Sequence, residues 1–298
     1  MMNCTDRSAA VGTAILRARD RKPAYDAFYP FLGNLFLAQE RARAGVDLQR
    51  LSPDPGRIHA FWVEGAPLLK RWEFPVDLRS AEEVRRELGG CIPGDNAEMA
   101  SAFAALSSGL EKGREKEGVI WRSFLRHDGE PWGRWIDTKG VDTASLLFLA
   151  RSCLRPSLEW TSSDLLRRYP PPETWHRGYC PVCGSLPALI VLKGEGERKG
   201  YCSWCSAAWS IDRLQCPYCD NRDHETLGYL QAEEEPQYRV QYCRLCKHYF
   251  KTIDTRESAE SLYLPLEEWT TLHLDLLARQ SGWDAPPSPA PAVYGPPE

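Results

Sequence analysis

Cysteine is the residue whose spacing carries the most chemical information in this chain. Four Cys-x-x-Cys pairs follow one another in the segments GYCPVCG, YCSWC, QCPYCD and YCRLC. The eight cysteines are Cys180, Cys183, Cys202, Cys205, Cys216, Cys219, Cys243 and Cys246. Two thiolates three positions apart on a tight turn can bind one ion, and two such turns complete the tetrahedral four-sulfur site that suits zinc or iron.

The four pairs form an internal repeat of two units. Each unit opens with Cys-Pro-x-Cys and closes with Tyr-Cys-x-x-Cys. Its two pairs are separated by 18 residues in the first unit and by 23 in the second. This spacing leaves room for a β-hairpin and is typical of a four-cysteine metal site. The repeat therefore predicts two such sites, in a segment whose small core would depend on metal binding for much of its folding free energy.

The residue after the second cysteine of each pair affects how easily the turn forms. A left-handed backbone is often needed there, and glycine adopts it at no steric cost. Gly184 occupies this position in the first pair, whereas Ser206, Asp220 and Lys247 occupy it in the other three. We expect these three turns to be less favourable than the first.

Other roles for paired cysteines fit the pattern less well. A reducing cytosol disfavours structural disulfides. A thioredoxin-like dithiol needs one Cys-x-x-Cys pair at a helix N-terminus in a βαβ unit, and iron–sulfur clusters use other spacings. Neighbouring histidines are expected at the surface, because eight thiolates already fill two tetrahedra. These are His176, His224 and His248. The remaining cysteines, Cys4, Cys91 and Cys153, are isolated, and we expect one exposed thiol and two residues in or near the core.

Composition excludes several classes of protein. The 298 residues are 43% hydrophobic and 26% charged, which is ordinary for globular domains. The net charge of −4 provides no basic field, and residues 176–256 hold eleven Lys and Arg against ten Asp and Glu. Nucleic-acid binding is therefore not expected. Apolar runs are too short for a membrane helix and no secretory signal is evident, so we expect a cytoplasmic protein without membrane insertion.

Apolar periodicity predicts helices in the first 170 residues. Helical spacing extends over 24–42, with a kink or a new start at Pro30, over 95–124, with a break near 109–118, and over 143–153. The aromatic stripe of 24–42 is expected to pack in the core rather than to line a cofactor pocket. No Gly-rich phosphate loop, nucleophile elbow or acid–base pair stands out, so we do not predict an enzyme.

The predicted fold class is α+β. A helical domain covers 1–172, and the YPPPE segment, which cannot continue a helix, ends it. Residues 173–256 contain two tandem four-cysteine ribbons of β structure, at about 174–212 and 213–256. Residues 257–298 contain a short helix, expected over 266–279, and a Pro-rich tail from Asp284 that is expected to be disordered.

The motifs together resemble one known family. CPVCG, YCSWC followed by Trp209, CPYC, YCRLC and the ensuing KTIDTR resemble the formate dehydrogenase accessory protein family, FdhE. The helical first half, with FYPFL at Phe28 to Leu32, is also similar. The resemblance implies rubredoxin-like iron sites, one at Cys180, Cys183, Cys202 and Cys205 and the other at Cys216, Cys219, Cys243 and Cys246. Zinc is the alternative, since both metals accept four thiolates.

The resemblance also implies a function. It suggests a cytoplasmic accessory protein that is required for active formate dehydrogenase and contacts its catalytic subunit, and that does not itself metabolise formate. The alternative is an electron-transfer protein of the double-rubredoxin type, and a zinc-ribbon nucleic-acid adaptor is a weaker third. The sequence does not set the oligomeric state, the binding surface or whether the sites cycle between redox states.

Overall fold

The chain contains two compact units, which are described separately here. The computed structural model describes residues 4–110, 114–126, 140–173, 175–231, 235–257 and 262–285. By contacts between residues, the first unit comprises 1–50 and 71–161, and the second comprises 51–70 and 162–298. The predicted domain boundaries at residues 172 and 256 stay predictions. The Pro-rich tail lies largely outside the described residues, from residue 286 onward.

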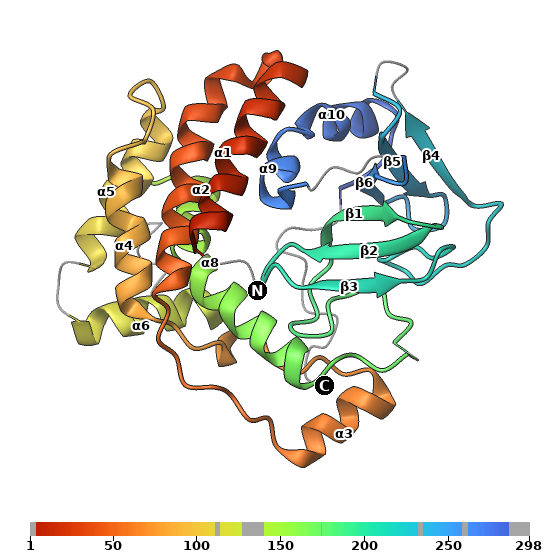
Figure 1. Cartoon of the computed structure of the whole chain (residues 1–298), viewed down its shortest axis with the longest axis horizontal. Helices are drawn as coiled ribbons and strands as arrows, with labels where there is room; N and C mark the ends of the chain where they lie inside the picture. Colours follow the sequence, from red (N-terminus) through yellow and green to blue (C-terminus); the bar gives the residue numbers. More distant parts are fainter. Residues whose placement is uncertain are drawn as a thin grey trace. The chain divides into compact units, whose positions relative to one another are not determined.

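The first unit is helical, as the sequence predicted (Figure 1). Its elements are α1 (Cys4–Arg21), the 3₁₀ helices η1 (Pro23–Phe28) and η2 (Arg71–Glu73), α2 (Tyr29–Ala44), α4 (Leu78–Gly89), α5 (Ala97–Leu110), α6 (Arg114–Arg126) and the greater part of α8 (Thr143–Arg168). Helix α5 begins within the range predicted from residue 95, and Asn96 caps it, since Asn96 Oδ1 accepts the Met99 amide at 2.9 Å. Helix α5 ends at Leu110 and α6 begins at Arg114. The break predicted near 109–118 falls in part on residues 111–113, which lie outside the described residues, and 114–118 belong to α6.

Helix α2 supplies the core of the first unit. It starts at Tyr29 with Pro30 in its first turn, so the new helix start predicted at Pro30 is confirmed. Four members of the predicted stripe, which are Phe31, Leu32, Leu35 and Phe36, are buried as expected for core packing, and Tyr29 is buried with them. The other two members are not in the core, since Tyr25 is half-buried and Phe28 is 49% exposed. The Tyr29 hydroxyl donates to the Ala18 and Lys22 carbonyls at 2.9 and 3.0 Å, which fixes α2 against the end of α1.

Helix α8 corrects one prediction. The sequence favoured a short helix over 143–153, but the helix continues to Arg168 through Pro156. Proline at position 156 cannot donate to the Ser152 carbonyl, which would ordinarily end or kink the helix there. The Gln39 side-chain amide donates to that carbonyl instead, at 2.9 Å. A donor from elsewhere in the chain therefore satisfies the carbonyl that proline leaves unpaired.

The second unit is built on one sheet of six strands. The strands are β1 (Pro187–Lys193), β2 (Glu197–Cys202), β3 (Ala208–Ile211), β4 (Leu227–Gln231), β5 (Tyr238–Cys243) and β6 (Tyr249–Asp254). Their order is β3-β2-β1-β6-β5-β4, so each predicted ribbon forms an antiparallel three-stranded half. The two halves join through a parallel pairing of β1 with β6, in which Ile190 lies opposite Thr252. The tandem ribbons therefore share one continuous sheet.

Two short helices cover one face of this sheet. Helices α9 (Leu264–Trp269) and α10 (Leu272–Gln280) replace the single helix expected over 266–279, because Thr270 and Thr271 interrupt it. Leu274 and Ala278 pack with Leu189, Val240 and other buried side chains of the sheet. An ion pair reinforces this packing, since Lys251 Nζ lies 2.9 Å from Asp275 Oδ2 and 3.0 Å from the Glu268 carbonyl.

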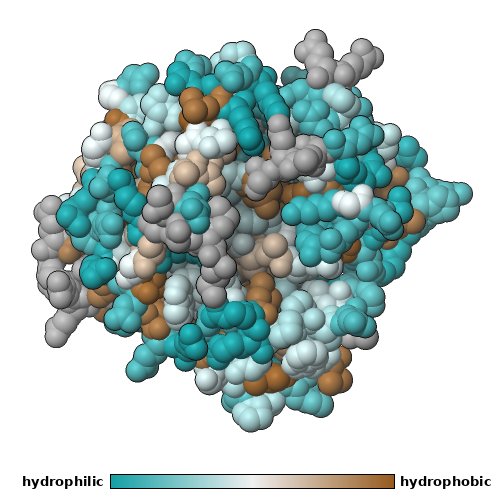
Figure 2. Space-filling view, in the orientation of Figure 1, coloured by the Kyte–Doolittle hydropathy of each residue, from teal (hydrophilic) through white to brown (hydrophobic). Residues whose placement is uncertain are grey.

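The surface agrees with an ordinary balance of polar and apolar side chains. Figure 2 shows hydrophilic residues over most of the face displayed, with apolar residues in small separate patches. No helix among the described residues is long and apolar enough to span a membrane.

Candidate metal centres

The four Cys-x-x-Cys pairs occupy equivalent turns of the sheet. The first and third turns precede β1 and β4, and the second and fourth connect β2 to β3 and β5 to β6. In the first turn, the Cys180 amide donates to the Ser185 carbonyl and the Gly184 amide donates to the Cys180 carbonyl. The same two bonds recur in the third turn, between Cys216 and Asn221 and between Asp220 and Cys216. The repeat in sequence is therefore a repeat in backbone geometry.

The left-handed residue that closes each turn is present in all four. Gly184 has φ = 72°, and Ser206, Asp220 and Lys247 have φ values of 62°, 62° and 66°. These three are the only non-glycine residues with positive φ in the described part of the chain. Each carries the cost of about 1–2 kcal/mol that a side chain pays in this conformation. The turns therefore form despite unfavourable residues, because the sulfur positions require that backbone.

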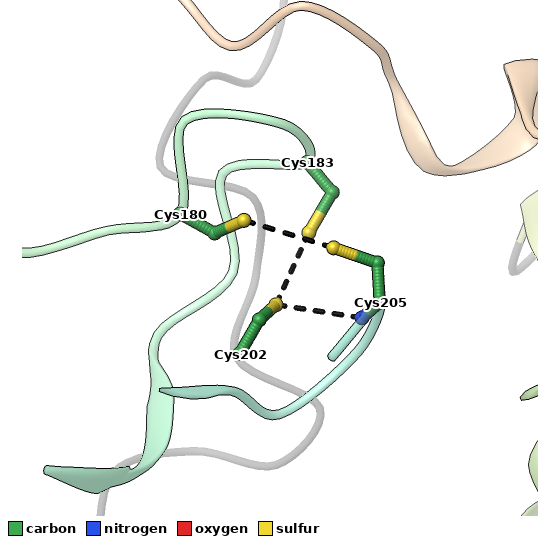
Figure 3. Close-up of side chains that lie close together, drawn as sticks. All are labelled: Cys180, Cys183, Cys202 and Cys205. Carbon is green, nitrogen blue, oxygen red and sulfur yellow. Dashed lines mark hydrogen bonds between the residues drawn. The ribbon is translucent and has the colours of Figure 1, made fainter. Parts of the chain in front are cut away.

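The structure brings the eight cysteines together in two groups of four. One group is Cys180, Cys183, Cys202 and Cys205, and the other is Cys216, Cys219, Cys243 and Cys246. Within each group all four Sγ atoms lie within 4.8 Å of one another. The turns of Cys180–Cys183 and Cys202–Cys205 face each other, so that all four sulfurs converge (Figure 3). We refer to these groups as the first and second centres.

The sulfur spacing fits a tetrahedral ion. Sγ–Sγ distances are 3.4 and 3.7 Å in the first centre and 3.7 and 3.8 Å in the second. A tetrahedron with metal–sulfur bonds of about 2.3 Å has edges of about 3.8 Å. A disulfide would bring two sulfurs to about 2.05 Å, and the cysteines with described side chains are all free. Each centre could thus hold one zinc or iron ion, and the geometry does not separate the two metals.

Electrostatics in the first centre favours a bound cation. The Cys202 sulfur accepts the amides of Trp204 and Cys205 at 3.3 and 3.4 Å. Burial raises the pKa of Cys180 and Cys205 well above the usual thiol value. Burial opposes charge at Cys183 too, but hydrogen bonds from the neighbouring sulfurs and Ser185 lower its pKa well below that value. The cage by itself favours a thiolate at Cys183 and opposes one at Cys180 and Cys205, and a divalent cation would supply the charge that holds these two sulfurs deprotonated.

Surrounding chain covers the first centre. All four of its cysteines are buried, and so are the residues between the paired cysteines except the half-buried Ser203, with Val182 at 0% and Trp204 at 3% exposure. The amides of Leu68 and Leu69, which follow α3 (Pro55–Glu64), donate to the carbonyls of Pro181 and Val182 at 3.0 and 2.8 Å. From the end of α8, the Ser162 hydroxyl donates to the Cys205 carbonyl at 2.8 Å.

The second centre reaches the surface. Cys219 and Cys246 are half-buried, and the apolar residues at the tips of its turns are exposed, with Tyr218 at 39% and Leu245 at 69%. Burial raises the pKa of Cys246 to about 11 and raises that of Cys216 further. At Cys243, burial is outweighed by hydrogen bonds from the Cys246 amide and the Asn221 side chain, which lower its pKa to about 7. These hydrogen bonds therefore prepare the Cys243 sulfur to meet a cation as a thiolate near neutral pH.

The other cysteines and histidines lie outside both groups. Cys153 is fully buried, as expected for a core residue, and burial raises its pKa to about 12. Cys91 is half-buried, and the Cys4 side chain lies outside the described residues. His176 and His224 are exposed, as predicted. His248 is half-buried, because its ring stacks on Tyr218 at 3.9 Å between centroids.

Sequence reasoning missed a cavity beside the second centre. It has a volume of about 150 Å³ and is lined by both halves of the sheet, including Arg198, Gln215 and Gln241. Arg198 is only 4% exposed and Gln215 only 2%. The sequence carried one signal of this cavity, which is the charged residue Arg198 in β2. Strand alternation turns its side chain toward the interior, and its cross-strand partners are Leu192 and Ile211.

Comparison with known proteins points to one family. The chain is 34% identical over 149 residues to the FdhE homolog of Aquifex aeolicus, covering 48% of this chain and 51% of that protein. It is 30% identical over 132 residues to the FdhE homolog of Haemophilus ducreyi, covering 43% and 42%. The matched region thus spans about half the length of these curated relatives. No protein-family model matches the chain.

A solved structure shares the fold over nearly the whole chain. The crystal structure of the FdhE protein from Pseudomonas aeruginosa superposes with a TM-score of 0.65 at 20% identity, covering 97% of this chain and 96% of that one. The helical first part, the sheet with two four-cysteine groups and the helical end are thereby confirmed as the fold. The chain is thus similar to FdhE homologues over about half of its length and shares the fold of an FdhE protein over nearly all of it.

Proposed function

We propose that this protein is an accessory protein required for the maturation of an active formate dehydrogenase. In this role it would contact the catalytic subunit in the cytoplasm through the unit that carries the two centres, and would not itself catalyse a reaction. Similarity to FdhE homologues supports the link to formate dehydrogenase. The observation that carries the proposal is the pair of four-cysteine groups, of which the second extends to the surface.

The two centres would have different tasks in this role. The first is enclosed by Leu68, Leu69 and Ser162, so a metal there would hold the sheet together. The second presents Tyr218 and Leu245 to solvent beside its sulfurs. Exposed aromatic and apolar side chains next to a rigid centre are suited to protein contact. We therefore place the contact with the catalytic subunit around the second centre.

The contact can be tested by capture of purified formate dehydrogenase catalytic subunit on the immobilised protein. Replacing Cys180 and Cys183 by alanine should unfold the first half of the sheet and abolish capture. The double variant Tyr218→Ala/Leu245→Ala should weaken capture while leaving metal content and circular dichroism unchanged. Cys91→Ala is the matched control, because this thiol belongs to neither group. Capture that persists at full strength in both altered proteins would contradict the proposal.

We also propose that both centres bind iron, with zinc as the alternative. The resemblance to the family supports iron, and four thiolates accept either metal. Metal content and a visible spectrum, measured on protein purified without oxygen and then oxidised, separate the two. Two irons per chain, one for each group of four cysteines, with thiolate-to-iron charge-transfer bands would support iron. Two colourless zincs would make the centres structural.

An electron-transfer protein of the double-rubredoxin type is the second candidate. The observation that favours it is the partial exposure of Cys219 and Cys246, since electron transfer requires a centre near the surface. Reversible one-electron cycling of the second centre, together with no capture of a catalytic subunit, would favour this function over the first.

A further inference from the structure

A buried arginine shares a cavity with two cysteines of the second centre. Arg198, Cys216 and Cys243 all line the cavity of about 150 Å³ described above. Arg198 belongs to β2, in the first half of the sheet, whereas Cys216 and Cys243 belong to the second centre. The first half of the sheet therefore contributes a cationic side chain to the surroundings of the second centre.

Hydrogen bonds fix the guanidinium of Arg198 beside these cysteines. Its Nη1 atom donates to the Gln215 carbonyl at 2.6 Å, and Gln215 directly precedes Cys216. Its Nη2 atom donates to Gln241 Oε1 at 2.8 Å. Gln241 lies two residues before Cys243 in β5, so strand alternation turns both side chains to the same face of the sheet. The guanidinium thus bonds to close neighbours, along the chain, of two cysteines of the second centre.

The charge of Arg198 has no carboxylate partner in the described part of the chain. Its Nη1 atom also donates to the backbone carbonyl of Asp212 at 3.0 Å, but the Asp212 carboxylate bonds to Arg222 and His176 instead. Burial lowers the pKa of Arg198 to about 10, and the charges of Cys216 and Asp212 oppose that fall, so the side chain stays charged at neutral pH. A buried cation without a counter-charge is strongly unfavourable, which indicates another source of negative charge nearby.

The internal repeat offers a comparison for this arginine. Arg198 lies four residues before Cys202, and Arg239 lies four residues before Cys243, so the two arginines occupy equivalent positions of the two units. Arg239 forms an ion pair with Asp254, at 3.2 Å between Nη2 and Oδ2. An arginine at this position therefore obtains a carboxylate partner in the second unit, whereas in the first unit it adjoins the second centre.

The second centre supplies the missing negative charge once it binds metal. Four thiolates around one divalent ion leave two excess negative charges on the centre. Apolar groups complete the cavity lining, including Leu227 and Phe250, so the charges interact with less screening than in water. We propose that Arg198 is the counter-charge of the second centre, and that it stabilises the metal-bound form and, with iron, the Fe²⁺ state over the Fe³⁺ state.

The direction of the redox effect follows from the charges. With four thiolates, Fe³⁺ leaves one excess negative charge and Fe²⁺ leaves two, so a fixed cation favours uptake of the electron and raises the reduction potential. This inference rests on metal binding at the second centre, which belongs to the proposed function, and it does not depend on contact with formate dehydrogenase.

Electrochemical titration of the iron-loaded full-length protein tests the proposal. Both centres can be loaded with iron, since four thiolates accept either metal, and the thiolate-to-iron bands report Fe³⁺. Cys219→Ser identifies the transition of the second centre, because it removes a ligand of that centre only. Arg198→Gln should raise the ratio of Fe³⁺ to Fe²⁺ in the second centre about tenfold at a fixed potential, a shift of about 59 mV to more negative potential. The transition of the first centre should not move.

Two further variants separate the charge of Arg198 from its hydrogen bonds. Arg198→Lys keeps a cation but loses the forked hydrogen bonds, so it should restore most of the potential. Gln241→Glu keeps the arginine and places a carboxylate beside its Nη2 atom, so it should cancel the charge and shift the potential in the same direction as Arg198→Gln. This variant also serves if Arg198→Gln fails to fold, which circular dichroism and the metal content of the first centre report.

Zinc affinity gives a second measurement that does not involve iron. In equilibrium competition with a coloured chelator, Arg198→Gln and Gln241→Glu should weaken zinc binding at the second centre about tenfold, because the metal-bound centre loses its counter-charge. Arg213→Gln is the matched control, since this cation lines the same cavity but is exposed to solvent. It should change the potential ratio and the zinc affinity by less than about twofold.

Three results would overturn the proposal. One is an unchanged potential of the second centre in both Arg198→Gln and Gln241→Glu. Another is an equal shift in Arg198→Lys and Arg198→Gln, because the hydrogen bonds and not the charge would then be responsible. The third is an equal shift in Arg213→Gln. A second centre that takes up no metal would overturn this inference together with the proposed metal role, whereas failed capture of the catalytic subunit would overturn the maturation role alone.

Discussion

Chelation should remove the two metals at very different rates. A chelator can reach the second centre directly, because Tyr218 and Leu245 at its turn tips are 39% and 69% exposed. To reach the first centre, the protein must open locally and expose Val182 and Trp204, which are 0% and 3% exposed. Exposing these two side chains to water raises the free energy of the open state by about 5 kcal/mol, because their apolar burial is lost. Since 1.4 kcal/mol is a factor of ten, release from the first centre should be about 10³- to 10⁴-fold slower.

The assay is stopped-flow mixing of zinc-loaded protein with an excess of a coloured zinc chelator. Absorbance should rise in two phases of equal amplitude, one for each group of four cysteines. Trp204→Ala should accelerate the slow phase by removing much of the burial that opposes opening, and it should leave the fast phase unchanged. Cys219→Ser should reduce or abolish the fast phase, because it removes a ligand of the second centre only.

Leu245→Ala is the control, since an exposed side chain does not limit access and neither phase should change. A single phase that releases both metals would refute the reasoning, because it would mean that the sheet opens as one unit. A fast phase of full amplitude in Cys219→Ser would refute the assignment of the fast metal to the second centre.

Three substitutions test the packing of the second unit by denaturant unfolding of the zinc-loaded protein. Gly178→Ala should destabilise it by about 2–3 kcal/mol, because a Cβ there would collide with the backbone of Pro217. Asp275→Asn should lower the free energy of unfolding by about 2 kcal/mol, because Lys251 is only 8% exposed and its charge would lose its carboxylate partner. Ser206→Gly should stabilise the protein by up to about 1 kcal/mol, the relief of left-handed strain less the added entropy of the unfolded chain.

Each of these substitutions has a matched control. Gly94→Ala adds a Cβ that meets nothing within 4 Å, so it should not destabilise the protein. Glu197→Gln breaks the exposed ion pair with Lys199, and this change should alter the free energy of unfolding by less than about 0.5 kcal/mol. Ser203→Gly places glycine in the same turn where φ is not positive, and should be neutral or destabilising. Equal effects in a substitution and its control would contradict the mechanism given for it.

The sequence predicted the grouping of the cysteines because the information is local. A Cys-x-x-Cys turn has its two sulfurs on one side, and the spacing between turns limits which pairs can meet. It predicted three of the turns to be less favourable, and there Ser206, Asp220 and Lys247 adopt the same left-handed backbone as Gly184 at the cost that a side chain has in that conformation. A propensity describes what a residue prefers in isolation, and the closed four-sulfur arrangement outweighs a preference of about 1–2 kcal/mol.

The features that the sequence did not predict depend on partners far apart in the chain. Helix α8 continues through Pro156 because Gln39, more than a hundred residues earlier, donates to the carbonyl that proline cannot serve. The two ribbons share one sheet because β1 pairs with β6. Neither pairing has a local pattern, since hydrophobic period and turn residues describe neighbours along the chain and not which distant segments meet.

The difference between the two centres has the same origin. The turn tips hold Val182 and Trp204 in one centre and Tyr218 and Leu245 in the other, and all four residues are apolar enough to be buried or exposed. What separates the centres is the chain that covers the first, where the amides of residues 68 and 69 bind its opening turn. The repeat thus specifies two equivalent cages, and a segment from outside it encloses one and leaves the other at the surface. A duplicated motif can in this way divide into a structural site and an accessible one with no change in its ligands.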